Sequence, residues 1–155
     1  MIPKLIYKIF ILFIIFNTLP LFAQTTMQAA TDQGQLAKIK KTRFAFILFK
    51  DINQYRRTHG LRPLYYSKLY TNLAQKHSDD MALRHKLDHQ GFKQRFALAQ
   101  SFHCVENAGW NNPSPALALS AWEHSDDHRK NLLDPDLTSA GIGIKSGYIT
   151  FFACK

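Results

Sequence analysis

The stretch Trp122–Gly143, W-E-H-S-D-D-H-R-K-N-L-L-D-P-D-L-T-S-A-G-I-G, carries more information about the fold than any other part of the chain. Ser125 is a suitable N-cap, and two aspartates follow it in the first turn, where a helix favours negative charge. Pro135 ends this helix, because proline cannot continue one. The stretch therefore predicts a short helix that carries His128, followed by a turn and then a strand.

Helices and strands are mixed along the rest of the chain, without β-α-β alternation. Apolar residues recur at helical spacing in Leu36–His59, and Gly60 is a natural stop. In a second helix that Ser67 caps, we expect Leu69, Leu73 and Met81 to face inward. The remaining predicted elements are this second helix to about Lys86, helices at Phe92–Phe102 and Pro115–His124, and strands at Cys104–Trp110, Ala140–Ile144 and Tyr148–Cys154. Joined by Lys145–Gly147, the last two strands form a hairpin, so we predict an α+β fold with helices on an antiparallel sheet.

The N-terminus is typical of a signal peptide. Lys4 and Lys8 precede or interrupt an apolar run that ends near Phe16, and Leu21–Ala23 offers a small residue at the expected cleavage point. The alternative is an uncleaved anchor, but the apolar run is shorter than the ~20 residues that a span needs. We expect residues 1–23 to be removed, residues 24–35 to form a mobile leader, and residues 36–155 to form one domain.

The chain is basic, with a formal net charge of +9. A basic exported protein is attracted to anionic surfaces such as lipid headgroups or envelope polyanions, although the charge can equally serve solubility. Basic runs interleaved with aromatics are absent from the sequence, so nucleic acid is not an expected partner. The predicted location is the periplasm or the extracellular medium.

The sequence contains two cysteines, Cys104 and Cys154. In an oxidising compartment an even pair favours a disulfide over two buried thiols. Closing so long a loop stabilises the fold by about 4 kcal/mol in the chain-entropy model. Because Cys154 lies in the last predicted strand, the bond would join that strand to the one that holds Glu106.

Histidines and one glutamate are the residues with chemical potential. His85 and His89 are four residues apart, as are His124 and His128, and this spacing allows two imidazoles on one helix face to share a metal. Chance surface histidines are the simpler explanation. Glu106 lies in an apolar strand, so its carboxylate needs an ion pair, a metal or hydrogen bonds, and a purely structural role satisfies this too. The sequence has neither an H-E-x-x-H zinc-protease motif nor a G-x-S-x-G nucleophile motif.

Several fragments, in this order, resemble the CAP superfamily, and specifically its bacterial extracellular branch. They are Ile52–Arg56 with Gly60–Leu64, Ala74 with His77–Ala82, Leu87–His89, Glu106–Ala108, and His128–Leu133 with Gly141–Gly143. The resemblance implies a three-layer α-β-α sandwich with a small central antiparallel sheet.

The resemblance also implies a pocket. Its residues here would be His89, Glu106, Asn107, Ser125 and His128, with Ser125 where many animal and plant relatives have an acidic residue. A divalent metal, usually zinc in such pockets, would be held by His89 and His128, with Glu106 as a further candidate. Two imidazoles and one carboxylate form an open zinc site with room for water.

Three functions follow as hypotheses. The favoured one is a secreted module that binds a small lipid or a partner protein, with Phe92 and Phe96 flanking the cleft. The first alternative is a metal-assisted hydrolase, protease-like, in which His128 and Glu106 are catalytic beside His89. The second is an envelope interaction or virulence factor that acts through its basic surface.

Overall fold

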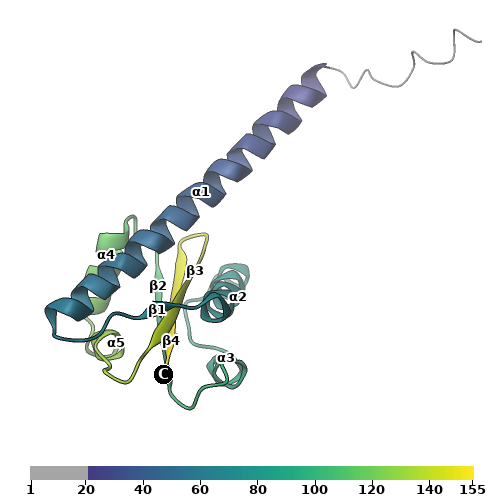
Figure 1. The fold of residues 1–155 in the computed structure, drawn as a ribbon. Helices are drawn as coiled ribbons and strands as arrows, with labels where there is room; N and C mark the ends of the chain where they lie inside the picture. Colours follow the sequence, from purple (N-terminus) through teal and green to yellow (C-terminus); the bar gives the residue numbers. More distant parts are fainter. Residues whose placement is uncertain (1–20) are drawn as a thin grey trace, which may run out of the picture. The chain divides into compact units, whose positions relative to one another are not determined.

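The structure, a computed structural model, describes residues 21–155, so the predicted signal peptide lies outside the described residues up to residue 20. The described residues form, in chain order, the elements labelled in Figure 1: α1 (Leu21–Thr58), β1 (Tyr65–Tyr66), α2 (Lys68–Arg84), α3 (Phe92–Leu98), β2 (Cys104–Trp110), α4 (Pro115–Glu123), α5 (Asp126–Leu132), β3 (Ser139–Lys145) and β4 (Tyr148–Cys154).

The four strands form one sheet in the order β1-β3-β4-β2. β4 pairs antiparallel with both neighbours, and the short β1 pairs parallel with β3. The predicted hairpin of β3 and β4 is confirmed, with Lys145 opposite Tyr148. Cys104 lies opposite Cys154, with their Cα atoms 4.1 Å apart, and the two are disulfide-bonded as predicted. The disulfide thus joins the strand that holds Glu106 to the centre of the sheet.

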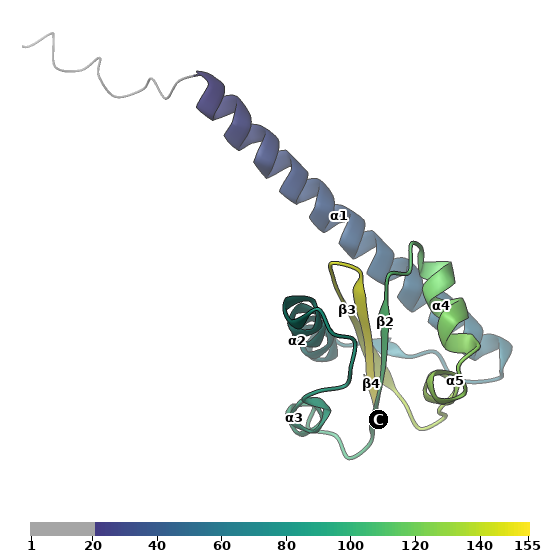
Figure 2. The same cartoon turned by 180° about the vertical axis from the view of Figure 1, so that it is seen from behind.

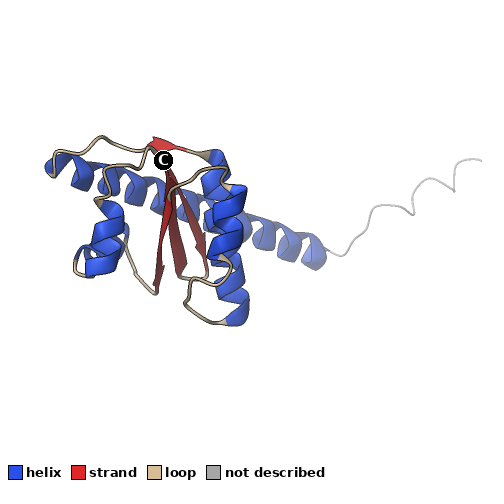
Figure 3. Ribbon diagram, turned by 90° about the horizontal axis from the view of Figure 1, so that it is seen from below, coloured by secondary structure: helices blue, strands red, loops and turns tan. Residues whose placement is uncertain are grey.

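β4 explains why the molecule has three layers. All seven of its residues are buried, and their side chains alternate between the two faces of the sheet. Phe151 packs in a core with residues of α1, α4 and α5, whereas Phe152 packs with residues of α2. Figures 1 and 2 show α2 and α3 on one side of the sheet and α4 and α5 on the other, and Figure 3 shows the strands between helices. This confirms the predicted α-β-α sandwich.

Two glycines bring α2 unusually close to the sheet. A Cβ atom at Gly141 would overlap the backbone at Thr71, and one at Gly143 would overlap the backbone at Ala74. Only glycine therefore lets β3 and α2 touch along their length. This contact fixes the helix that carries His77.

α1 is longer than predicted, because it begins at Leu21 rather than near Leu36. Residues 24–35, expected as a leader, are helical: they are rich in alanine and glutamine, and extending a helix is easier than starting one. Residues 1–39 and residues 40–155 form separate units, and the sheet belongs to the second. Within residues 21–155, no helix combines the length and apolar character that a bilayer span requires.

Two local predictions were wrong. Leu69 is exposed, and Tyr70 packs edge-on against Phe152 in its place. The third helix ends at Leu98 rather than Phe102, because Gln100 has a left-handed backbone conformation that stops it. Ser125 occupies the N-cap of α5 as predicted, but its side chain makes no capping hydrogen bond.

Candidate functional site

Glu106 and Arg95 form a buried ion pair between β2 and α3. The Arg95 guanidinium donates from Nε to Oε2 and from Nη2 to Oε1 of Glu106, both at 2.7 Å. Its third nitrogen, Nη1, donates to the carbonyl of Gln90 at 2.9 Å. Arg95 therefore fixes both the carboxylate and the loop that precedes α3.

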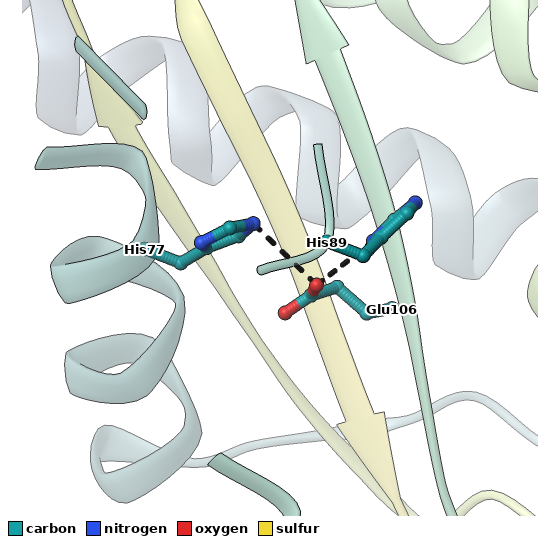
Figure 4. A group of neighbouring side chains, drawn as sticks. All are labelled: His77, His89 and Glu106. Atoms are coloured by element: carbon teal, nitrogen blue, oxygen red, sulfur yellow. Dashed lines mark hydrogen bonds and ion pairs between the residues drawn. The ribbon is translucent and has the colours of Figure 1, made fainter. Parts of the chain in front are cut away.

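His89 lies on that loop and reaches the same carboxylate. Its Nδ1 is 2.9 Å from Glu106 Oε1, and 49% of its side chain is exposed (Figure 4). Since Glu106 accepts, Nδ1 carries the proton and Nε2 is left unprotonated in the neutral ring. The loop is held on its other side by Arg84, which makes two hydrogen bonds to Asp88. His89 is thus a preoriented imidazole.

His77 is a third member of the cluster that the sequence analysis did not assign to the pocket. It is buried on α2, and its Nε2 lies 2.8 Å from the Asp88 carbonyl and 3.5 Å from Glu106 Oε1 (Figure 4). Burial lowers the pKa of His77, although the charge of Glu106 opposes this. The signal that could have identified His77 was its place in the buried stripe of α2, which consists of Leu73, Ala74, His77, Ser78 and Met81.

Glu106 stays ionised in this setting. Burial raises its pKa, but the hydrogen bonds from His89 and Arg95 and the charge of Arg95 outweigh burial, so the net shift of the pKa is downward. Arg95 was also missed by the sequence analysis. It lies between Phe92 and Phe96 on a short helix, where a buried arginine implies a buried carboxylate nearby.

His128 lies on α5, and Asn107 of β2 joins its backbone to the strand that holds Glu106. Asn107 is fully buried; its amide donates to the His128 carbonyl at 3.0 Å, and its Oδ1 accepts from Asn131 at 2.9 Å. Asn131 also donates to the Glu106 carbonyl, so α5 is fastened to β2. The indole of Trp122 also bonds to β2, because its Nε1 donates to the carbonyl of Ala108 at 3.2 Å.

The charge of His89 acts on the imidazole of His128. Burial lowers the pKa of His128, and the charge of His89 lowers it further. Its ring lies 6.4 Å from that of Trp122. Ser125 begins the same helix and is half-buried. The structure therefore joins His89 and Glu106 directly, with Asn107 holding the His128 backbone.

The residues can be tested for their fit to a metal. One ligand atom each of His77, His89 and Glu106 lies within 4.8 Å of the others. Both oxygens of Glu106 already accept from Arg95, however, and Nε2 of His77 faces a carbonyl, so it carries a proton. These two groups fit the role of outer partners better than that of ligands. His89, oriented by a carboxylate with its other nitrogen free, matches the usual arrangement of a metal-binding histidine.

A hollow lies on the side of the sheet away from β2. We call it the β3-edge groove; it has a volume of about 520 Å³. α1 supplies one wall, and α2, β1 and β3 supply the others. Its lining residues are Lys41, Thr42, Ala45, Phe46, Phe49, Tyr66, Thr71, Gln75, Ile142 and Ile144.

The aromatic residues predicted to flank a cleft lie elsewhere. Phe92 and Phe96 stack on each other, and Phe92 packs on Phe152 in the core. They are therefore part of the packing of α3. The groove was missed because α1, β1 and β3 are distant in sequence, although Lys41, Ala45 and Phe49 recur at helical spacing.

Comparison with known proteins identifies the family. Residues 49–155 match the cysteine-rich secretory protein family, CAP, and the chain belongs to this family. The uncharacterized protein YkwD of Bacillus subtilis is 29% identical over 149 residues, which cover 81% of this chain and 58% of YkwD. The chain thus spans little more than half of that relative.

Solved structures share the fold. An extracellular protein containing a SCP domain from Bacillus anthracis superposes with a TM-score of 0.71 at 24% identity, covering 74% of this chain and 41% of that one. An outer surface protein from Borrelia burgdorferi superposes with a TM-score of 0.64 at 19% identity, covering 70% of this chain and 90% of that one. At these identities the likeness concerns the fold alone.

Proposed function

We propose that this CAP domain is a secreted binding module that takes a small apolar molecule in the β3-edge groove. The observation that carries the proposal is the groove itself, whose volume of about 520 Å³ lies in the usual range for small-molecule sites and whose walls are largely apolar. Phe46 and Tyr66 are both more than half exposed there, which is costly in water and is relieved by a ligand. Secretion is supported by the extracellular and outer-surface proteins that share the fold.

Binding receives more support than hydrolysis. A general base must be free to accept a proton from a nucleophile, whereas both oxygens of Glu106 already accept hydrogen bonds from Arg95 and the pKa of Glu106 is lowered. His128 would have to act without a carboxylate that accepts from its ring. The hydrolase hypothesis therefore has weaker support than the binding hypothesis.

Fluorescence of the neutral dye Nile red tests the proposal. Ala45 lines the groove, so Ala45→Trp should fill it and abolish the increase in fluorescence that the wild-type protein gives. Ala116 is exposed on α4 and is not among the lining residues, so Ala116→Trp is the matched control and should bind like the wild type. Equal binding by both variants, or none by the wild type, contradicts the proposal.

A divalent metal at His89 and His128 is a second candidate function. It is favoured by the hydrogen bond from His89 Nδ1 to Glu106, which leaves Nε2 as the metal-binding nitrogen. When bound, zinc would supply a Lewis acid at the solvent side of the cluster. Glu106 would orient His89 from behind, and Asn107 would hold the backbone of His128.

Calorimetric titration with zinc tests this candidate. His89→Ala and His128→Ala should each remove binding, and Glu106→Gln should weaken it by about 10–100-fold because His89 loses its orientation. His124→Ala is the control, since His124 bonds to the Ser120 carbonyl on α4 instead. Unchanged zinc affinity in the His128 variant would exclude this pair as the site.

A further inference from the structure

Another hollow lies between α2 and α3, and we call it the α2–α3 pocket. It has a volume of about 310 Å³, near the lower end of the usual range for small-molecule sites, so it suits one small molecule. It shares no lining residue with the β3-edge groove. Its polar lining consists of Lys76, His77 and Asp80 of α2, Gln90 of the following loop, and Gln94 and Arg95 of α3.

A buried nitrogen of this lining lacks a partner. His77 Nδ1 makes no hydrogen bond within the described part of the chain. Because His77 Nε2 donates to the Asp88 carbonyl at 2.8 Å, Nδ1 is the unprotonated nitrogen and can only accept. Buried polar atoms are nearly always paired, so this nitrogen fits a hydroxyl or N–H group that arrives with a ligand.

The charges around the pocket favour a neutral ligand. Arg95 is paired with Glu106, and Asp80 accepts hydrogen bonds from Nε and Nη2 of Arg84. Lys76 lies four residues before Asp80 on α2, so this wall carries one charge of each sign. A ligand with a net charge would therefore meet a like charge as well as an opposite one.

Two side-chain amides stand on the opposite wall. Gln90 and Gln94 are exposed, and neither side-chain amide bonds to another described residue. A Cβ atom at Gly91 would lie 3.1 Å from Gln94 Oε1, so glycine, here at a φ of 77°, leaves room for this amide. Each carboxamide both donates and accepts, as a hydroxyl group does. Leu98 adds apolar surface beside them.

We propose that the α2–α3 pocket binds one neutral sugar ring. One hydroxyl group would donate to His77 Nδ1, and others would bond to Gln90 and Gln94, while the C–H groups of the ring pack on Leu98. A sugar ring combines hydroxyl groups that donate and accept with apolar C–H groups, which matches this lining. An apolar ligand would leave His77 and both amides unpaired. The site is independent of the β3-edge groove and adds a second ligand to the protein.

Nuclear magnetic resonance of the ¹⁵N-labelled protein tests the proposal. The probes are glucose, galactose, mannose and N-acetylglucosamine, and at least one should bind with a Kd on the order of millimolar, as expected for so small a ligand. The ¹⁵N resonance of His77 Nδ1 should move to lower frequency as this nitrogen gains a hydrogen bond. That of His124 Nδ1, which bonds to the Ser120 carbonyl, should not move. Binding of none of the four sugars, or an unmoved His77 resonance, would overturn the proposal.

Exposed amide variants locate the site. Gln90→Leu combined with Gln94→Leu should weaken binding of the sugar by about tenfold, the usual size of one or two lost neutral hydrogen bonds. Asn72→Leu is the matched control, because it removes an exposed amide of α2 that does not line the pocket. It should bind like the wild type. Equal affinities of the two variants would place the sugar elsewhere and overturn the proposal.

Charged forms of the bound sugar test its neutrality. The uronic acid and the amino sugar keep the ring and add a negative or a positive charge. Neither should bind more tightly than the neutral sugar, because each meets a like charge at Asp80 or Lys76. A tenfold preference for either charged form would overturn the assignment of a neutral ligand.

A tetrasaccharide of the same sugar distinguishes two sources of the ring. If the ligand is a free monosaccharide, the tetrasaccharide should bind more weakly, since the pocket holds one ring. If the ligand is a unit of an envelope glycan, the tetrasaccharide should bind at least as tightly. Tetrasaccharide binding that the double glutamine variant leaves unchanged would contradict both.

Discussion

Arg95 and Glu106 are joined by two hydrogen bonds of 2.7 Å, one to each carboxylate oxygen, inside a contact between α3 and β2. The pair has little access to water, and His89 and His77 are the other ionisable side chains close to Glu106. Removing one partner of such a buried pair lowers the stability of the protein far more than replacing both partners.

Arg95→Met should therefore destabilise the protein by about 3–5 kcal/mol, since it leaves Glu106 buried without its cation. Urea unfolding followed by circular dichroism measures this. Arg84→Met breaks two partly exposed ion pairs, with Asp80 and Asp88, and should lower the unfolding free energy much less. The double variant Arg95→Met/Glu106→Leu should recover part of the loss. Equal losses in the two single variants would contradict the role of burial.

His77 predicts a dependence of stability on pH. Its pKa is lowered below the ordinary value of 6.5 in the folded protein, so the unfolded chain binds a proton more readily as pH falls. The free energy of unfolding should decrease between pH 6.5 and 5, with His77 contributing at most about 1.4 kcal/mol per pH unit. His128, whose pKa is also lowered, adds to the slope.

His77→Gln should flatten this slope, because glutamine does not titrate. Unfolding curves at pH 7, 6 and 5 for the variant and the wild type give the comparison. An unchanged slope would mean that His77 binds its proton equally well in the folded and unfolded states, and would contradict a pKa lowered by folding.

The close approach of Gly143 to the backbone of α2 predicts that a larger residue at this position destabilises the fold. Gly143→Ala places a Cβ on the backbone of Ala74, and such overpacking should lower stability by about 1–3 kcal/mol or more. Gly34→Ala is the control: nothing lies within 4 Å of its Cβ position, and alanine should favour the helix. Melting temperatures that move in opposite directions for the two variants would confirm the contact.

The disulfide predicts a large effect of reduction. Cys104 and Cys154 are separated by 50 residues, and loss of the bond should lower the unfolding free energy by about 4 kcal/mol. The Cys104→Ala/Cys154→Ala variant and the reduced wild-type protein should agree when unfolded in urea. A loss in the variant alone would indicate a packing effect at the buried Cys154 instead.

The elements that were predicted correctly are those that local sequence determines. β4 is apolar except for Thr150, and the Lys145–Gly147 turn before it has two left-handed residues, Ser146 and Gly147. Its pairing with β3 follows from so short a connection. β1 has only two residues and pairs with the distant Ser139 and Ala140, so periodicity could not find it.

The site was predicted less completely, because burial is a tertiary property. The family motifs led to His89, Glu106 and His128, whereas Arg95 and His77 became visible only when α2 and α3 were placed on the sheet. Lys41 and Thr71 belong to different helices, so the groove that they share has no continuous signal in the sequence.

The outer strand β2 has a consequence for the behaviour of the protein at high concentration. The side chains of Asn131 and Trp122 occupy the backbone carbonyls of Glu106 and Ala108, which an incoming strand of another molecule would otherwise use. The sheet is thereby protected against edge-to-edge polymerisation. Asn131 lies on the helix of His128, so one short helix both carries this histidine and covers the edge of the sheet.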